Sequence, residues 1–149
     1  MRKALPFLFL LAGACTGRGD TVLQLDQQSY RFPASHVRSA TDEGHRFVRI
    51  KPPEARFELV YDSRIAGSSD PDGWPLVFSL NGEGTPNVER HAFGELKVVC
   101  RRAVNPRNGC GIEIHHRGSV WNALFPRKHM LQARRIERQA HLLLENYAA

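Results

Sequence analysis

The stretch that decides the fold is VWNALFPRKHMLQARRIERQAHLLLENY, residues 120–147, because its pattern of apolar residues changes at Pro126. Before the proline, residues 120–125 have the β-branched and aromatic composition of a strand. From residue 127 onward, apolar side chains recur at spacings of three and four, which places them on one stripe of a helix. The members of this stripe are Ala133, Ile136, Ala140, Leu143 and Tyr147. The sequence therefore predicts a last strand followed by an amphipathic helix that covers one face of a sheet.

Short strand-like runs separated by turn residues fill the chain before this stretch. Residues 21–25 and 29–32 alternate polar and apolar side chains around a three-residue turn, which predicts a hairpin. Further strands are expected at residues 46–51, 57–62, 74–80, 95–100 and 110–116. Residues 34–44 are expected to be polar, with at most a turn of helix. Loops are expected at residues 63–73, which supply no core side chains, and at residues 81–90, while residues 91–93 fit either a strand or a loop. The expected fold class is α+β, a small and mainly antiparallel β-sheet domain with a C-terminal amphipathic helix.

The amino terminus has the layout of a signal peptide. It opens on MRK and continues with the uncharged residues 4–14, which span about 16 Å as a helix and are too short for roughly 30 Å of bilayer hydrocarbon. The segment ends in LAGAC, residues 11–15, which resembles the lipobox of bacterial lipoproteins. The resemblance departs from the family pattern at Ala12, where leucine is more usual.

The resemblance implies a processed and lipidated protein. Residues 1–14 would be removed, Cys15 would carry a diacylglyceryl group and an added acyl chain, and residues 15–20 would tether a single periplasmic α+β domain over residues 21–149. Two or three acyl chains anchor a protein stably to a membrane. Thr16 stands where lipoproteins of the inner membrane typically carry aspartate, so the resemblance implies a periplasm-facing position on the outer membrane of a Gram-negative bacterium. The alternative is cleavage by ordinary signal peptidase, which leaves Cys15 as a free thiol.

Two cysteines remain once Cys15 is assigned to the lipid. Cys100 and Cys110 lie at the turn-proximal ends of two predicted strands, in a compartment where disulfides persist, so we expect them to be bonded. A metal or redox role is the alternative. The spacing is not that of a C-x-x-C motif, and the sequence holds no second cysteine pair for a structural zinc site.

Charge is distributed unevenly along the chain. The net charge is +6, but residues 20–96 carry 8 Lys and Arg against 12 Asp and Glu, whereas residues 97–149 carry 10 against 3. Such asymmetry favours an anionic partner for the basic segment. The candidate contacts are Arg101, Arg102, Arg107, Arg134, Arg135 and Arg138. The alternative is a solvated surface that complements the acidic part of the same fold.

These features favour a non-enzymatic binding module held at the membrane by its lipid. We expect its partner to be an envelope protein or an anionic envelope polymer, with an inhibitor or immunity-like role as one version, and we expect no cofactor, no metal and no nucleic acid. One alternative is a small envelope hydrolase or metal-dependent enzyme that uses Glu113 and His115, which share a face of their predicted strand, with help from residues such as His91 or Asp62. Another is a structural subunit of an envelope assembly that docks through the C-terminal helix.

Overall fold

The computed structural model describes residues 19–78, 88–102 and 109–149. In these residues the larger sheet has the strand order β3-β4-β5-β9-β8-β7-β6, and all neighbouring strands are antiparallel. Its strands are β3 (Val37–Thr41), β4 (Phe47–Ile50), β5 (Glu58–Asp62), β6 (Val88–Phe93), β7 (Leu96–Arg101), β8 (Cys110–His116) and β9 (Ser119–Phe125). A separate hairpin pairs β1 (Thr21–Gln24) with β2 (Ser29–Phe32). The predicted antiparallel α+β domain and its first hairpin are confirmed.

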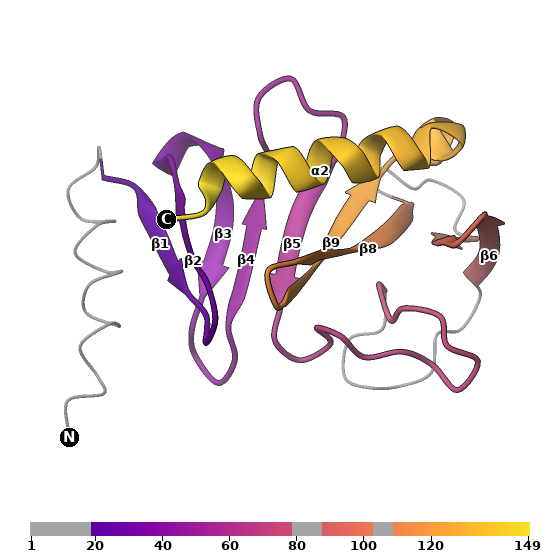
Figure 1. Cartoon of the computed structure of the whole chain (residues 1–149), viewed down its shortest axis with the longest axis horizontal. Coiled ribbons are helices and arrows are strands. Elements are labelled where there is room, and N and C mark those ends of the chain that lie inside the picture. Colours follow the sequence, from indigo (N-terminus) through magenta and orange to yellow (C-terminus); the bar gives the residue numbers. More distant parts are fainter. Residues whose placement is uncertain (1–18, 79–87, 103–108) are drawn as a thin grey trace.

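The chain after Pro126 begins as a 3-10 helix, η2 (Arg127–Gln132), and continues as the α-helix α2 (Ala133–Tyr147). Figure 1 shows α2 crossing the strands of the larger sheet, with its C-terminal end beside the hairpin. The predicted stripe is confirmed at four positions, but Leu144 is buried where Leu143 was expected, and Leu143 is only partly buried. A spacing of three or four fits both leucines, so the sequence pattern alone does not distinguish them.

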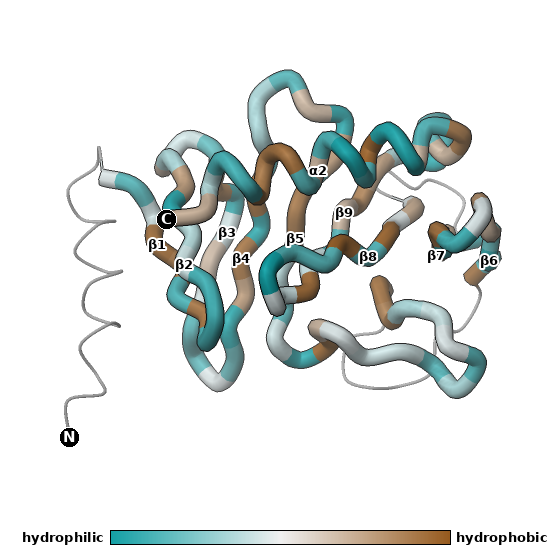
Figure 2. Tube along the Cα trace, viewed as in Figure 1, coloured by the Kyte–Doolittle hydropathy of each residue, from teal (hydrophilic) through white to brown (hydrophobic). Residues whose placement is uncertain are grey.

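One aromatic core joins the hairpin, the sheet and the helix. The ring of Tyr30 meets the ring of Trp121 edge to face at 5.2 Å between centroids, and the ring of Phe32 meets that of Tyr147 at 4.8 Å. Tyr30, Phe32 and Trp121 are fully buried. Figure 2 shows hydrophobic residues along β5 and alternating hydrophilic and hydrophobic residues along α2. Edge-to-face pairs add to the stabilisation that burial of such large side chains provides.

The other face of the sheet is covered by the segment 63–78, which differs from two predictions. Residues 74–78 form no strand and make only an isolated bridge between Ser69 and Pro75, while residues 79 and 80 lie outside the described part. Val77 is buried against Gly111, and Ile65 is buried too, so the predicted surface loop does supply a core side chain. An apolar run indicates that a segment is buried. This segment is buried because it lies across the face of the sheet, and it does not form one of the strands.

Two strands occupy stretches that the sequence marks as polar. β3 lies within the expected polar segment 34–44, which begins with the short 3-10 helix η1 (Ala34–His36), and β6 begins within the expected loop 81–90. Both strands are at the edges of the sheet, where few side chains are buried and apolar alternation is therefore weak. The first part of that loop lies outside the described residues. Over the described ranges, we find no helix with the length and apolar character needed to span a membrane.

Candidate functional site

The strands β7 and β8 are joined at one end and separate toward the other. Their register pairs Val99 with Gly111 and Cys100 with Cys110, and within the described residues the ladder between them is limited to these two pairs. A disulfide joins Cys100 to Cys110, with 4.0 Å between the Cα atoms, as the sequence predicts. β7 is paired with β6 along its whole length, so the residues of β7 before Val99 have β6 and not β8 as their partner. The two strands therefore form a fork whose closed end is covalently fixed.

A cavity of about 430 Å³ is associated with this fork. The segment 63–78 forms one wall, the β6–β7 turn with the start of β7 and the second half of β8 form others, and the first two turns of α2 complete the lining. The charged and titratable residues of the lining are Glu95, Lys97, Glu113, His115, Arg134 and Glu137. The cavity therefore brings carboxylates, an ammonium, a guanidinium and an imidazole around one space.

Glu113 and His115 are neighbours on the face of β8 that lines the cavity, as the two-residue period of a strand predicts. Nε2 of His115 lies 2.9 Å from Oε1 of Glu113, and the His115 side chain is 70% exposed. When Nε2 carries the proton, it donates to the carboxylate and leaves Nδ1 as a proton acceptor. This arrangement is chemically suited to hydrogen bonding and to proton transfer.

The residues suggested as further metal ligands lie elsewhere. His91 is next to Glu89, with 3.2 Å between Nε2 and Oε1, and the buried Asp62 accepts hydrogen bonds from the side chain of Arg64 at 2.8 and 3.0 Å. Within residues 19–78, 88–102 and 109–149, no group of three His, Cys, Asp or Glu side chains is placed to hold a metal ion. The structure thus brings Glu113 and His115 together but adds neither His91 nor Asp62 to them.

The two cations of the cavity are fixed by backbone carbonyl groups. Nζ of Lys97 donates to the carbonyl oxygen of Gly73 at 2.8 Å and lies 5.5 Å from the ring centroid of Trp74. Arg134 donates from Nη2 to the carbonyl oxygen of Phe93 at 2.8 Å. An ammonium group has three donors and a guanidinium five, so both side chains retain donors beyond these bonds. The cations are therefore held in position with hydrogen-bonding capacity to spare.

The arginines that the sequence suggests for an anionic partner lie in three places. Arg134 lines the cavity, whereas Arg135 and Arg138 are exposed on the outer side of α2. Arg101 and Arg102 are exposed at the end of β7, where the guanidinium of Arg101 lies 4.4 Å from the ring centroid of Phe78. Arg107 lies outside the described residues.

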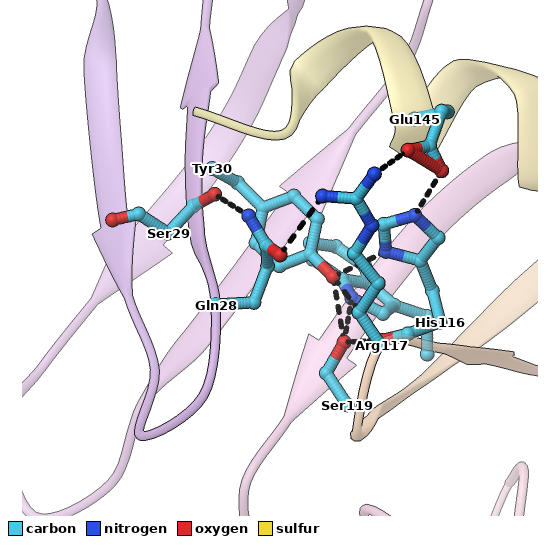
Figure 3. Close-up of polar contacts among 8 residues, drawn as sticks. Gln28, Ser29, Tyr30, His116, Arg117, Ser119 and Glu145 are labelled. Carbon is cyan, nitrogen blue, oxygen red and sulfur yellow. Dashed lines mark hydrogen bonds and ion pairs between the residues drawn. The ribbon is translucent and has the colours of Figure 1, made fainter.

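A buried polar network, which the sequence does not predict, surrounds the turn between β8 and β9. Tyr30 Oη lies 2.7 Å from Nδ1 of His116 and 2.7 Å from Oγ of Ser119, and Nε2 of His116 lies 3.0 Å from Oε1 of Glu145 (Figure 3). The Ser119 hydroxyl also contacts the backbone oxygen of His116 at 2.7 Å. The only sequence signal for this network is strand alternation, which turns His116 toward the core when His115 faces the cavity.

This network holds together the hairpin, the turn and the last turn of α2. Arg117 has a positive φ of 46°, and its guanidinium pairs with Glu145 and donates to Oε1 of Gln28. Burial raises the pKa of the Tyr30 hydroxyl. The hydrogen bond with His116, together with Arg117, holds the pKa of Glu145 below its usual range. The network thus fixes the end of β8 that carries His115.

The cavity and the buried network are therefore adjacent on β8, and the cavity offers space for a ligand. Its lining combines fixed cations with carboxylates and one imidazole. No protein-family model, curated protein or solved structure matches this chain.

Proposed function

We propose that the protein is a membrane-anchored envelope lipoprotein whose domain acts as a non-enzymatic binding module, with the cavity at the β7–β8 fork as its ligand site. The observation that carries this proposal is the pair of cations, Lys97 and Arg134, held by backbone carbonyls around a cavity of about 430 Å³. The volume of the cavity lies within the range of small-ligand sites. The N-terminal resemblance to lipoproteins supports the anchor.

The charges of the cavity favour a ligand that carries both signs. Lys97 and Arg134 suit a carboxylate, with which a guanidinium forms directional hydrogen bonds. Glu95 and Glu137 line the same space and suit an amine. Peptidoglycan stem peptides carry carboxylates and free amines, and they occur in the compartment that a lipoprotein signal implies. We therefore propose a stem peptide of peptidoglycan as the ligand.

The binding test uses the purified lipidated protein in detergent and muropeptides released from peptidoglycan as the probe. We expect calorimetric titration to show binding, and we expect Arg134→Ala to weaken it about tenfold, since a hydrogen bond to a charged group contributes about 1.5 kcal/mol. Arg138→Ala is the matched control, because it removes an exposed arginine one turn further along the same helix. Acetylation of the probe's amines should also weaken binding.

Equal affinities for the two arginine variants, with unchanged melting temperatures, would place the ligand outside the cavity. A wild-type protein that does not bind the muropeptides would contradict the ligand assignment.

The anchor has its own test, which is independent of the ligand. We expect metabolic labelling with palmitate to label the wild-type protein and to fail with Cys15→Ala, because the thiol is the attachment point. A fully soluble, unlabelled periplasmic protein would reject the lipoprotein assignment and leave the cavity proposal to stand on the titration.

A second candidate function is hydrolysis, which the Glu113–His115 pair in the cavity favours. A carboxylate next to an imidazole can orient it as a general base toward a bound substrate. Mass spectrometry of the muropeptides after incubation separates the two functions. Cleavage by the wild type that is lost in His115→Ala, with binding retained, would establish the enzyme. Recovery of the intact probe from the wild type would support the binding module.

A further inference from the structure

An exposed stripe of apolar and basic side chains begins at Leu131, near the end of the 3-10 helix η2, and runs along the outer side of α2. Leu131 is 84% exposed and Leu142 is 66% exposed, and these are the exposed large hydrophobic residues of the described part of the chain. On α2, the exposed Arg135 and Arg138 and then Leu142 follow at spacings of three and four residues, and Leu131 comes four residues before Arg135, in η2. Such spacings place side chains on the same side of a helix. We call Leu131, Arg135, Arg138 and Leu142 the outer stripe.

The chemistry of the outer stripe matches a membrane surface. Leucine side chains on a surface helix enter the boundary between headgroups and acyl chains, while basic residues on the same helix meet lipid phosphates. Each arginine near an anionic leaflet strengthens the attachment about fivefold. Guanidinium groups also form paired hydrogen bonds with phosphate oxygens. The two leucines thus flank the two cations in an order suited to lying flat on lipid.

The place where the chain enters the domain brings this stripe near the proposed anchor. Thr21 starts β1 and pairs with Phe32, whose ring lies 4.8 Å from that of Tyr147 in the last turn of α2. Figure 1 shows the start of β1 and the C-terminal end of α2 on the same side of the domain. The six residue steps from Cys15 to Thr21 span at most about 21 Å. A lipid on Cys15 therefore keeps the C-terminal half of α2 close to the bilayer.

We infer that the outer stripe docks on a bilayer surface that contains anionic phospholipid, so that α2 lies parallel to the membrane. This inference rests on the lipid anchor of the proposed function. The lipid anchor holds the domain near the bilayer, and the outer stripe fixes the orientation of the domain on it. Two attachment points prevent the domain from turning freely about its tether. The segment 63–78, which covers the opposite face of β8, then faces away from the lipid.

The test places an environment-sensitive fluorophore on the outer stripe of the lipidated, full-length protein. Leu142→Cys supplies the only free thiol, since Cys15 is acylated and Cys100 is bonded to Cys110. The label is nitrobenzoxadiazole, and the vesicles contain phosphatidylethanolamine and phosphatidylglycerol. We expect its emission to shift to the blue and to rise at least twofold relative to protein in detergent-free phosphatidylcholine vesicles. The matched control is Asp72→Cys, an exposed position in the segment 63–78, which should report water in both vesicles.

Charge reversal provides the second measurement. We expect Arg135→Glu combined with Arg138→Glu to return the label at residue 142 to the spectrum of an aqueous environment, with an unchanged melting temperature because both side chains are exposed.

The outcomes separate this inference from the anchor on which it rests. A label at residue 142 that reports water while palmitate labelling persists would overturn the docking and leave the anchor intact. Shielding of the label in native envelopes but not in pure vesicles would show that a protein covers the stripe, which also overturns docking on lipid. Loss of palmitate labelling would overturn the anchor and the docking together.

Discussion

Removal of the Cys100–Cys110 disulfide is expected to destabilise the domain by about 3 kcal/mol. The two cysteines are 10 residues apart in the sequence, and the loop-closure relation gives about 2.8 kcal/mol at 25 °C for a ring of this size. Both side chains are fully buried, so alanine is the appropriate replacement because serine would add a buried hydroxyl group. The change to make is therefore Cys100→Ala together with Cys110→Ala.

This free energy corresponds to a large shift in melting temperature. A domain of about 130 residues unfolds with an entropy of roughly 0.27 kcal/mol/K, so a loss of about 2.8 kcal/mol lowers the midpoint by about 10 °C. Thermal unfolding followed by circular dichroism measures the shift. Cys15→Ala serves as the control, since it replaces a cysteine and leaves the Cys100–Cys110 bond intact. Reduction of the wild-type protein should reproduce most of the shift.

Loss of the disulfide is also expected to affect ligand binding at the fork. The covalent bond fixes one end of a β7–β8 ladder that has only two residue pairs in the described part, so its loss should also weaken muropeptide binding at the open end. A double variant that melts within about 2 °C of the wild type would refute the loop-closure argument. A variant that melts 10 °C lower but binds unchanged would refute the link between the disulfide and the cavity.

Three further changes test the packing and the charges. Gly111→Ala points a methyl group into the side chain of Val77, so we expect chemical denaturation to show a loss of 1 to 3 kcal/mol (about the usual cost of overpacking) that Val77→Ala largely relieves. Tyr30→Phe leaves the buried imidazole at the end of β8 without its hydroxyl partner and should cost about 1 to 3 kcal/mol in the same assay; no loss would mean that the network is not stabilising. Burial alone would raise the pKa of Asp62, but the hydrogen bonds from Arg64 outweigh it and hold the pKa below its ordinary value. The resulting stabilisation is present above the ordinary pKa and is lost on acidification, so the melting temperature should fall below about pH 4, and less steeply in Asp62→Asn.

The sequence predicts well those elements that pack one face against the aromatic core. In β5, β8 and α2 the apolar side chains of that face recur with the period of the element. The pattern is weak in β3 and β6, which lie at the edges of the sheet and bury little. It misleads at residues 74–78, where Val77 is apolar because it covers the sheet and not because it belongs to it.

The candidate site is predictable only in part, for a similar reason. The adjacency of Glu113 and His115 follows from the two-residue period of a strand. The cavity does not, because it depends on where β7 leaves β8 and on where the first turn of α2 lies, and these bring Lys97 and Arg134 together from distant parts of the chain. Local sequence patterns carry no information about contacts between residues that are far apart in the chain.

The contacts of Tyr30 join parts of the domain that are far apart in the chain. Its hydroxyl partners, His116 and Ser119, come 86 and 89 residues later, and a hairpin of two four-residue strands is not stable alone in water. We therefore expect the emerging amino-terminal part to stay open during synthesis until β8, β9 and α2 have been made. For a chain that carries the proposed export signal, such a delay would keep the polypeptide extended enough to thread through a translocation channel before it closes on the far side.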